Sequence, residues 1–429
     1  MPNRTGFIRW LSVLGIVAAF SSAEAADWSR FRGPNGSAVS DARGVPTEWS
    51  DSKNLAWKTE LPGPGSSSPI IVGDRVFVTC YSGYGTSREA AGDIKQLQRH
   101  LICVSLKNGK ILWDKPVVSK QSEDRFNGFL QDHGYATSTP TSDGEHVFVF
   151  FGKSGVLAFD LDGKQLWQTQ VGTGSGMNGW GSGSSPVLFQ NTVIVNAAAE
   201  AKSLIALDKK TGKEAWRSDA DSIHGSWATP VLVDAPNGKT ELVVNAPYEM
   251  WGFNPENGDF LWFTEGIQDM TICGSLVARD GIVYAIGGRS GSAVAVKSGG
   301  RDDVSKTHVV WKKSLSSYVP SPVLAGDRIL SVNERGVVGC LDAKTGEQIF
   351  QQRLSNASGV YASPVVIDGK VYVVTRRGGT VVADFAGSRV NVISENMFKD
   401  ETDFNASPAV TEGKLLLRSN RALYCIATQ

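Results

Sequence analysis

The sequence has no excess of charge of either sign, because its 43 Lys and Arg residues are matched by 43 Asp and Glu residues. This balance gives no electrostatic reason to expect a nucleic-acid partner. No Ser-His-Asp order, paired-carboxylate motif or H-E-x-x-H motif is identifiable, and no C-x-x-C pair occurs among the five cysteines. The sequence therefore assigns no catalytic residue and no metal site, although a site assembled from distant segments stays open.

The sequence also has no apolar run long enough for a membrane span. The apolar stretch from Trp10 to Phe20 is too short to cross a bilayer. Two arginines precede it, and an Ala-x-Ala sequence that ends at Ala25 follows it. This order predicts a signal peptide over residues 1–25, and therefore an exported protein, periplasmic or secreted, without a transmembrane segment after cleavage. This N-terminal segment contains no Arg-Arg pair, which would indicate twin-arginine export. No cysteine lies near the cleavage site to carry a lipid.

Glycine is abundant, with 47 residues, which indicates many tight turns between short strands. A Ser/Thr-Pro element recurs 42 to 46 residues apart, except for a first interval of 71 residues. Such a period is typical of propellers and other repeat folds. Eight copies are present, with Leu in place of Pro in the fifth: Ser68-Pro69, Thr139-Pro140, Ser185-Pro186, Thr229-Pro230, Ser275-Leu276, Ser321-Pro322, Ser363-Pro364 and Ser407-Pro408.

Each copy contains short apolar runs separated by turn signals such as Gly73-Asp74 and Asp143-Gly144. It closes with a turn and an aromatic-centred strand, and we interpret the aromatic residue as a wedge between neighbouring units. The closing residues are Trp113, Trp167, Trp216, Trp262, Trp311 and Phe350, with Val392 in the seventh copy. Four strands per unit are typical of a propeller blade. The sequence thus predicts an all-β, eight-bladed β-propeller of four-stranded antiparallel blades.

The last blade lacks its fourth strand, because the eighth copy ends at Gln429 after its third strand. Residues 54–60 have the closing pattern, centred on Trp57, without preceding strands. We therefore expect this N-terminal strand to close the ring and to leave no terminal sheet edge exposed. The predicted organisation is a signal peptide over 1–25, an N-terminal segment with the ring-closing strand over 26–61, and propeller repeats over 62–429.

Two insertions, residues 81–100 and 117–131, explain the long first interval. We expect Ser87 to His100 to form one short helix capped by Ser87. The cysteines Cys103, Cys340 and Cys425 align with alanines of other copies, which predicts a packed small-residue position. Cys80 and Cys103 lie on successive strands of one blade, so a disulfide between them stays open.

The element that runs from Ala206-Leu207-Asp208 through Thr211-Gly212 to Trp216 resembles the repeat of the pyrroloquinoline-quinone (PQQ) propeller family. That family includes the eight-bladed quinoprotein dehydrogenases and the BamB propeller lipoprotein of outer-membrane barrel assembly. The segment Trp28 to Gly36 looks like that of exported planctomycete-type propellers. The resemblance implies the fold and, for a dehydrogenase, PQQ with Ca²⁺. This chain departs from the dehydrogenases in lacking two adjacent cysteines, and from the BamB relatives in lacking a lipidated cysteine.

Because strand direction alternates, the turns between second and third strands lie on the same face of the ring as the links between blades. We call this face the top face. Ligands usually bind where variable loops gather over a rigid scaffold. The turns carry a basic arc of Lys153, Arg289, Arg335, Arg376, Arg377 and Arg421, opposite Glu200 and Glu249. The links between blades carry Asp132 together with aromatic and histidine residues. The candidate ligand-binding residues are His133, Tyr135, Trp180, His224, Trp227, Arg289, Arg335, Arg376 and Arg421.

These residue types leave several ligands open. The basic arc suits a carboxylate-rich ligand or the acidic patch of a partner protein, and equally suits solvated turn charges. Aromatic residues at a channel mouth suit a stacked sugar or quinone, or a protein hot spot. The two histidines suit either a hydrogen-bonded structural role or a metal pair.

We predict an exported, monomeric, non-catalytic binding or scaffold protein that uses its top-face loops. Its partner would be an envelope protein, a small anionic ligand or a polysaccharide. The alternatives are a PQQ-dependent alcohol or sugar dehydrogenase that uses Ca²⁺, and a polysaccharide-binding propeller.

Overall fold

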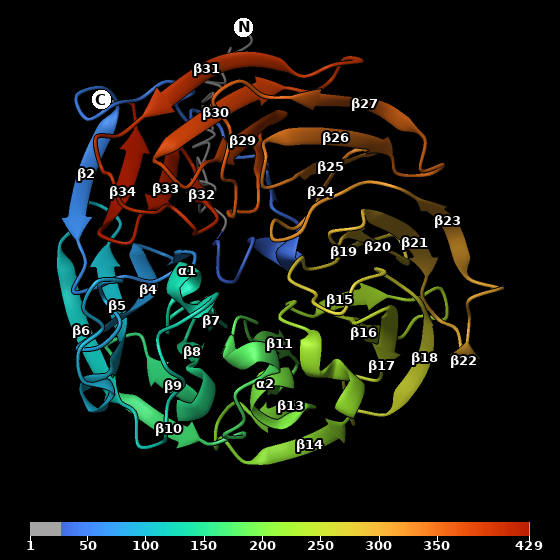
Figure 1. Ribbon diagram of the computed structural model, residues 1–429, viewed down its shortest axis with the longest axis horizontal. Helices are drawn as coiled ribbons and strands as arrows, with labels where there is room; N and C mark the ends of the chain where they lie inside the picture. The colour runs from blue at the N-terminus through green and yellow to red at the C-terminus, as the bar shows by residue number, and fades with distance from the viewer. Residues whose placement is uncertain (1–26, 429) are drawn as a thin grey trace, which may run out of the picture.

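The computed structural model describes residues 27–428, which form a closed ring of eight β-sheets around a central channel (Figure 1). Each sheet contains four antiparallel strands, sequential in the chain except in blade eight, and two sheets carry a short fifth strand that pairs in parallel; the predicted eight-bladed β-propeller is confirmed. The predicted signal peptide lies outside the described residues. Within residues 27–428, no helix combines the length and the apolar character that a membrane span requires.

The first four blades follow one another along the chain. Blade one contains β3 (Ile70–Val72), β4 (Arg75–Ser82), β5 (Gln98–Ser105) and β6 (Ile111–Val118). Blade two contains β7 (Thr141–Ser142), β8 (His146–Phe150), β9 (Val156–Asp160) and β10 (Gln165–Thr169). Blade three contains β11 (Val187–Phe189), β12 (Thr192–Ala197), β13 (Ser203–Asp208) and β14 (Glu214–Asp219). Blade four contains β15 (Val231–Asp234), β16 (Thr240–Ala246), β17 (Glu249–Phe253) and β18 (Phe260–Glu265), with β22 (Asp302–Asp303) added at its edge.

The remaining blades complete the ring. Blade five contains β19 (Val277–Arg279), β20 (Ile282–Gly287), β21 (Ser292–Lys297) and β23 (Val309–Lys313). Blade six contains β24 (Val323–Ala325), β25 (Arg328–Val332), β26 (Val337–Asp342) and β27 (Gln348–Arg353). Blade seven contains β28 (Val365–Ile367), β29 (Lys370–Val374), β30 (Gly379–Asp384) and β31 (Asn391–Met397), with β1 (Val39–Ser40) added inside. Blade eight contains β32 (Ala409–Thr411), β33 (Lys414–Arg418), β34 (Ala422–Ala427) and the N-terminal β2 (Leu55–Glu60).

The helices are short and lie between strands. They comprise α1 (Leu130–His133), α2 (Ala198–Ala201), and the 3₁₀ turns η1 (Pro34–Gly36), η2 (Ile94–Gln96), η3 (Gly152–Ser154), η4 (Met177–Gly179) and η5 (Asp221–Gly225). The prediction of one helix from Ser87 to His100 is wrong. Only η2 forms there, because β5 begins at Gln98 and pairs with β4 as far as Ser82.

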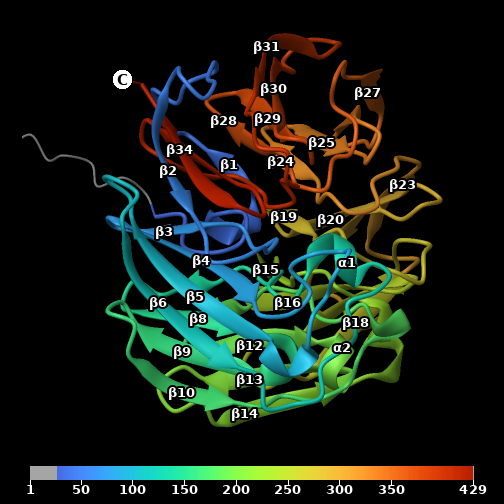
Figure 2. The same cartoon turned by 60° about the vertical axis from the view of Figure 1, so that its left-hand side comes forward.

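The N-terminal strand closes the ring as predicted. In Figures 1 and 2, β2 lies beside β34 at the edge of blade eight, and their register places Trp57 opposite Cys425. The same register pairs Trp113 with Cys103 and Phe350 with Cys340 in their blades. The small-residue position is therefore confirmed. All five cysteines are free, so Cys80 and Cys103 form no disulfide.

The closing tryptophans are wedges between blades, and their contacts explain the glycines of the closing turns. Five indole N–H groups donate to a backbone carbonyl of the next blade, namely those of Trp57, Trp113, Trp167, Trp216 and Trp311. Beneath Trp57 lies Gly109, which has a φ of 74° and whose added Cβ would come within 2.7 Å of the indole ring. The turn requires glycine for its backbone conformation and for this close approach.

Two closing positions depart from this pattern. Trp262 turns inside its own blade, where its indole N–H donates to the buried Glu241 carboxylate at 2.8 Å. In blade seven, Val392 is 41% exposed, and Ser394 instead occupies the wedge position opposite Val382. The prediction for Val392 is therefore wrong. Trp49 of the N-terminal segment fills the gap, stacks on Tyr372 with 6.3 Å between ring centroids, and joins the core of blades seven and eight.

The recurring Ser and Thr residues form a closed ring of eight hydrogen bonds around the channel. In every blade, the backbone N–H of this residue donates to the side-chain oxygen of the equivalent residue in the next blade, at 2.9–3.0 Å. The donors in order are Ser68, Thr139, Ser185, Thr229, Ser275, Ser321, Ser363 and Ser407, and Ser407 donates back to Ser68. These residues are buried, and a buried backbone N–H requires such a partner.

We expect Ser363→Ala to lower the free energy of unfolding by about 1–3 kcal/mol, because it leaves the buried N–H of Ser321 without an acceptor. Ser363→Thr should retain most of the stability, since threonine already fills the equivalent positions 139 and 229. Denaturant unfolding followed by circular dichroism measures both. Equal midpoints for the alanine variant and the unaltered chain would contradict a stabilising ring.

Candidate functional site

A cavity of about 130 Å³ lies on the propeller axis. Its walls include one residue from each blade, located two positions before the Ser or Thr of the hydrogen-bonded ring. In extended backbone, residues i and i+2 point the same way, so both positions face the channel. The eight wall residues are Ser66, Thr137, Gly183, Trp227, Cys273, Val319, Tyr361 and Asn405.

The roof of the cavity comes from the link between blades one and two. Phe129 precedes α1, and its ring centroid lies 5.1 Å from that of Trp180 and 6.1 Å from that of Tyr361. Those two residues belong to links on different sides of the ring, so Phe129 spans the channel. Trp180 also packs on Trp227, with 5.2 Å between ring centroids. The aromatic side chains therefore form a continuous row over the cavity.

His133 of α1 is hydrogen-bonded through both ring nitrogens. Its Nε2 lies 2.9 Å from the carbonyl oxygen of Trp180, and its Nδ1 lies 2.7 Å from the Thr137 hydroxyl. Burial lowers the pKa of His133 to about 4, so the imidazole is neutral at pH 7. The neutral ring donates from Nε2 and accepts at Nδ1. Burial raises the pKa of the Cys273 thiol to about 12, so this wall residue is neutral as well.

The acidic side chain of Asp132 holds the roof in place. Its carboxylate lies 2.7 Å from Arg88 of the blade-one insertion and 3.2 Å from Arg376 of blade seven. The side-chain amide of Asn405 donates to its backbone carbonyl at 2.6 Å. Arg376 also pairs with Asp403 at 2.7 Å. Turns and links far apart in sequence therefore meet on one face, as the strand alternation predicts.

The floor of the cavity is the N-terminal segment, which occupies the centre of the ring in Figure 1. Trp28 pairs with Ile71 of blade one, the carbonyl of Ser29 accepts from Ser142 of blade two, and β1 pairs with β28 of blade seven. Between these contacts, Phe31 lines the cavity from below. The segment that resembles the planctomycete-type motif thus closes one end of the channel.

The structure gathers three of the predicted residues around the cavity, His133, Trp180 and Trp227. Tyr135 is buried elsewhere, where its hydroxyl donates to the carbonyl of Asp124 at 2.7 Å. His224 lies half-buried in η5 and does not line the cavity. Sequence reasoning missed Phe129, Cys273, Tyr361 and Asn405. Counting two residues back from each repeated Ser or Thr would have found the last three.

The basic arc is largely paired with carboxylates. Lys153 contacts Asp124 at 2.9 Å, Arg289 contacts Asp269 at 3.7 Å, and Arg421 contacts Glu60 at 3.1 Å. Arg335 is exposed and, within residues 27–428, forms no ion pair. On the other side, burial raises the pKa of Glu200 to about 7, and Glu249 accepts a hydrogen bond from Trp251. The exposed charge of the arc is therefore carried by Arg289, Arg335, Arg377 and Arg421.

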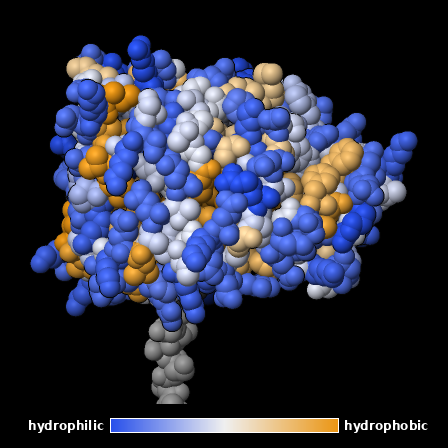
Figure 3. Space-filling view, turned by 90° about the horizontal axis from the view of Figure 1, so that it is seen from below, coloured by the Kyte–Doolittle hydropathy of each residue, from blue (hydrophilic) through white to orange (hydrophobic). Residues whose placement is uncertain are grey.

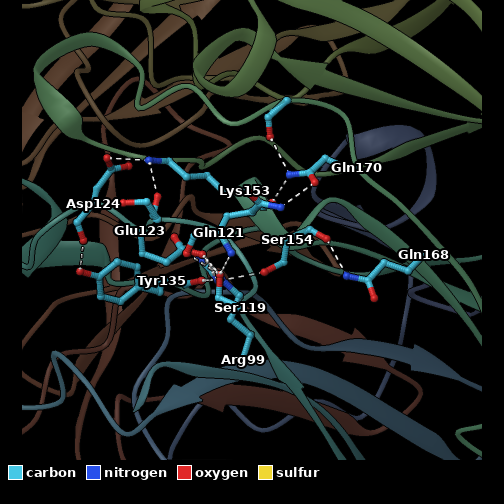
Figure 4. Close-up of polar contacts among 12 residues, drawn as sticks. Arg99, Ser119, Gln121, Glu123, Asp124, Tyr135, Lys153, Ser154, Gln168 and Gln170 are labelled. Atoms are coloured by element: carbon cyan, nitrogen blue, oxygen red, sulfur yellow. Dashed lines mark hydrogen bonds and ion pairs between the residues drawn. The ribbon is translucent and has the colours of Figure 1, made fainter. Parts of the chain in front are cut away.

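A buried charge network fixes the second insertion to blades one and two (Figure 4). Both carboxylate oxygens of Glu123 accept hydrogen bonds from Arg99, at 2.8 and 2.9 Å, and each side chain is only 4% exposed. Next to this pair, Lys153 donates to Asp124 and to the Ser175 hydroxyl. Among the described residues, no group of three or more His, Cys, Asp or Glu is arranged to hold a metal ion.

The outer surface contributes less to the site. In the edge-on view of Figure 3, apolar side chains lie among hydrophilic ones. The exposed large apolar residues come from several blades, and include Leu112, Phe260, Val310 and Met397.

Comparison with known proteins places these features in a family context. A family model described as outer membrane protein assembly factor BamB matches residues 92–200, 177–307 and 279–392. BamB of Burkholderia pseudomallei is 24% identical over 398 residues, covering 80% of this chain and 92% of that protein. BamB of Yersinia pestis is 23% identical over 255 residues, covering 53% of this chain and 59% of that protein.

Two solved structures share the fold. BamB from Moraxella catarrhalis superposes with a TM-score of 0.61 at 16% identity, covering 86% of this chain and 96% of that one. A europium-containing methanol dehydrogenase superposes with a TM-score of 0.64 at 12% identity, covering 94% and 98%. At such identities these two similarities establish the fold alone.

Proposed function

This chain belongs to the family of outer membrane protein assembly factor BamB, and on that premise we propose that it is an exported, non-catalytic propeller that binds another envelope protein through its top face. The observation that carries this proposal is the family match, whose segments together span residues 92–392. The curated relatives that it resembles are named as assembly factors, which act on other proteins.

The top face has the features of a protein-binding surface. The blade-one insertions pack around the buried aromatic cluster of Tyr81, Tyr84, Phe126 and Tyr135, which gives them a fixed conformation. Preorganised loops bind with a smaller entropic cost than disordered ones. Around the ring, Arg289 and Arg335 present exposed cations that complement an acidic patch. We infer that the partner contacts the insertions and these arginines together.

The residues around the cavity do not fit PQQ with Ca²⁺. Calcium takes about six to eight oxygen ligands and prefers carboxylates, and within residues 27–428 no Asp or Glu lines the cavity. The lining consists of aromatic rings, hydroxyls, a thiol, a neutral imidazole, Gly183, Val319 and the Asn405 amide, whose single carbonyl oxygen is too few for such a site. We therefore assign no redox chemistry to this site.

The proposal is tested by capture from solubilised cell envelopes of the source organism, with the purified chain as bait and identification of the bound proteins by mass spectrometry. We expect an envelope protein whose recovery falls at least about tenfold with Arg289→Glu/Arg335→Glu, since each rim reversal changes attraction into repulsion. The matched control is Lys210→Glu/Lys344→Glu, which reverses two exposed lysines in the closing turns on the opposite face. Recovery that is equal for both double variants would overturn the top-face assignment.

A further inference from the structure

Two arginines lie in the floor of the channel, Arg32 buried and Arg30 half-buried, and within residues 27–428 neither has an acidic partner. Arg32 is 1% exposed, and its guanidinium donates one hydrogen bond among the described residues, from Nη2 to the carbonyl of Pro322. Its Nε and Nη1, and the Nε of Arg30, are buried and have no hydrogen-bond partner. On the top face, Arg376 pairs with the carboxylates of Asp132 and Asp403. Within residues 27–428, neither Arg30 nor Arg32 forms an ion pair with a carboxylate. The floor therefore holds positive charge that the described residues do not neutralise.

This arrangement is costly for the protein alone. An unpaired buried charge costs several kcal/mol, and a guanidinium remains protonated because its pKa is far above 7. Burial lowers the pKa of Arg32 to about 9, with a further contribution from the neighbouring charge of Arg30, and burial lowers the pKa of Arg30 to about 10. Both groups are thus cationic at pH 7 and repel each other. A negative charge between them would relieve both penalties.

A small, partly open void lies at these two arginines. Its volume is about 10 Å³, close to that of one water-sized sphere. Its walls contain both arginines and two hydroxyls of the hydrogen-bonded ring, those of Thr229 and Ser275. The Thr229 oxygen accepts from the N–H of Ser185, and the Ser275 oxygen accepts from the N–H of Thr229. Each hydroxyl hydrogen therefore remains available for donation.

The side chains around the void offer donors and no negative charge. Its remaining wall residues are Phe31, Gly36, Pro230, Val231 and Leu276, none of which has a polar side chain. A site with guanidinium and hydroxyl donors, no carboxylate, and room for one small sphere suits a monatomic anion.

We propose that this void binds one small inorganic anion of the size of chloride, held by Arg30, Arg32, Thr229 and Ser275. The site lies below the cavity and is independent of the proposed partner binding on the top face. A bound anion would fasten the N-terminal segment to blades four and five. Since that segment also pairs with blades one and seven, anion binding would stabilise the closed ring.

Halide-dependent melting of the full purified chain tests the proposal. At constant ionic strength, replacing gluconate by chloride should raise the melting temperature by several degrees and then saturate, because a ligand that binds only the folded state stabilises it. Arg32→Gln should abolish the chloride effect, whereas Arg335→Gln, which removes an exposed arginine, should keep it. A melting temperature of the unaltered chain that is the same in chloride and gluconate would overturn the proposal.

Crystals of the unaltered chain grown in bromide provide a second test that does not depend on a variant that folds. We expect an anomalous peak between Arg30 and Arg32. Density for a water molecule there, without an anomalous signal, would overturn the anion site.

Discussion

Trp57→Ala is expected to lower the free energy of unfolding by about 3–5 kcal/mol, the usual cost of truncating a large buried aromatic side chain. Trp57 is 9% exposed, its indole N–H donates to the carbonyl of Leu106 at 3.0 Å, and its ring covers Gly109. These contacts join blade eight to blade one. Because Trp57 belongs to the strand that completes blade eight, its loss weakens the one junction that closes the ring.

Denaturant unfolding followed by circular dichroism measures this effect. Trp216→Ala is the matched comparison, because Trp216 makes the equivalent contact with Pro255 inside the continuous chain. Trp180→Ala is the control for removal of an indole from the half-buried cavity roof, and should cost clearly less. A Trp57→Ala variant that unfolds together with the unaltered chain would show that the N-terminal strand does not close the propeller.

Arg99→Leu is expected to cost about 3–5 kcal/mol, because it leaves the Glu123 carboxylate buried without its cation. The two side chains form a bidentate pair, and Arg99 also donates from Nε to the carbonyl of Tyr135 at 2.9 Å. The double variant Arg99→Leu/Glu123→Leu should be more stable than Arg99→Leu, since apolar replacement of a whole buried pair is often nearly neutral. Arg421→Leu, which breaks the exposed pair with Glu60, should cost about 0–1 kcal/mol.

The pH dependence of stability gives a second measurement on the same pair. Burial alone would raise the pKa of Glu123, but the charge and hydrogen bonds of Arg99 bring it below its usual value. A depressed carboxylate pKa contributes stability above the unfolded pKa of about 4.3, and this contribution is lost as the pH falls through the folded value. In Arg99→Leu the two largest contributions that lower the pKa of Glu123 are lost, and burial is opposed only by the Ser119 hydrogen bond and the charge of Lys153, so protonation relieves the variant. The difference in unfolding free energy between the two chains should therefore shrink from pH 7 toward pH 4. A constant difference would contradict the role of the Arg99 charge.

Much of the fold could be predicted because its stabilising contacts repeat. A wedge such as Trp113 meets the next blade in the same way as Trp216, so the aromatic residue, the turn glycine and the small third-strand residue recur at fixed spacing. The Ser and Thr of the hydrogen-bonded ring recur for the same reason. Where the repeat fails, the prediction failed as well. Val392 was assigned to the wedge position, whereas Trp49 from outside the repeat fills the gap.

The candidate site was predicted less completely. Its wall residues differ in every blade, from Gly183 to Trp227, because they face the cavity and make no equivalent contact with a neighbour. The roof and floor come from single segments that occur once. Arg376 was predicted as an exposed ligand-binding cation, and its location on the top face is as expected, but only the structure shows its pairing with Asp132 and Asp403.

The sequence by itself determined the eight blades, the four strands of each and the N-terminal strand that closes the ring. The strands of each blade follow from strand alternation and turn residues, which act between near neighbours in the chain. The closing strand follows from its repeat pattern, although it pairs with β34 at the other end of the chain. Only the tertiary structure decided that Phe129 spans the channel, that residues 28–40 close its floor, and that Arg32 is buried there beside the half-buried Arg30. Several of these contacts join residues hundreds of positions apart, as in the bond from Arg32 to Pro322, and they form only once the ring has closed. Closure brings such segments together on one axis, and a contact made once leaves no periodic pattern in the sequence.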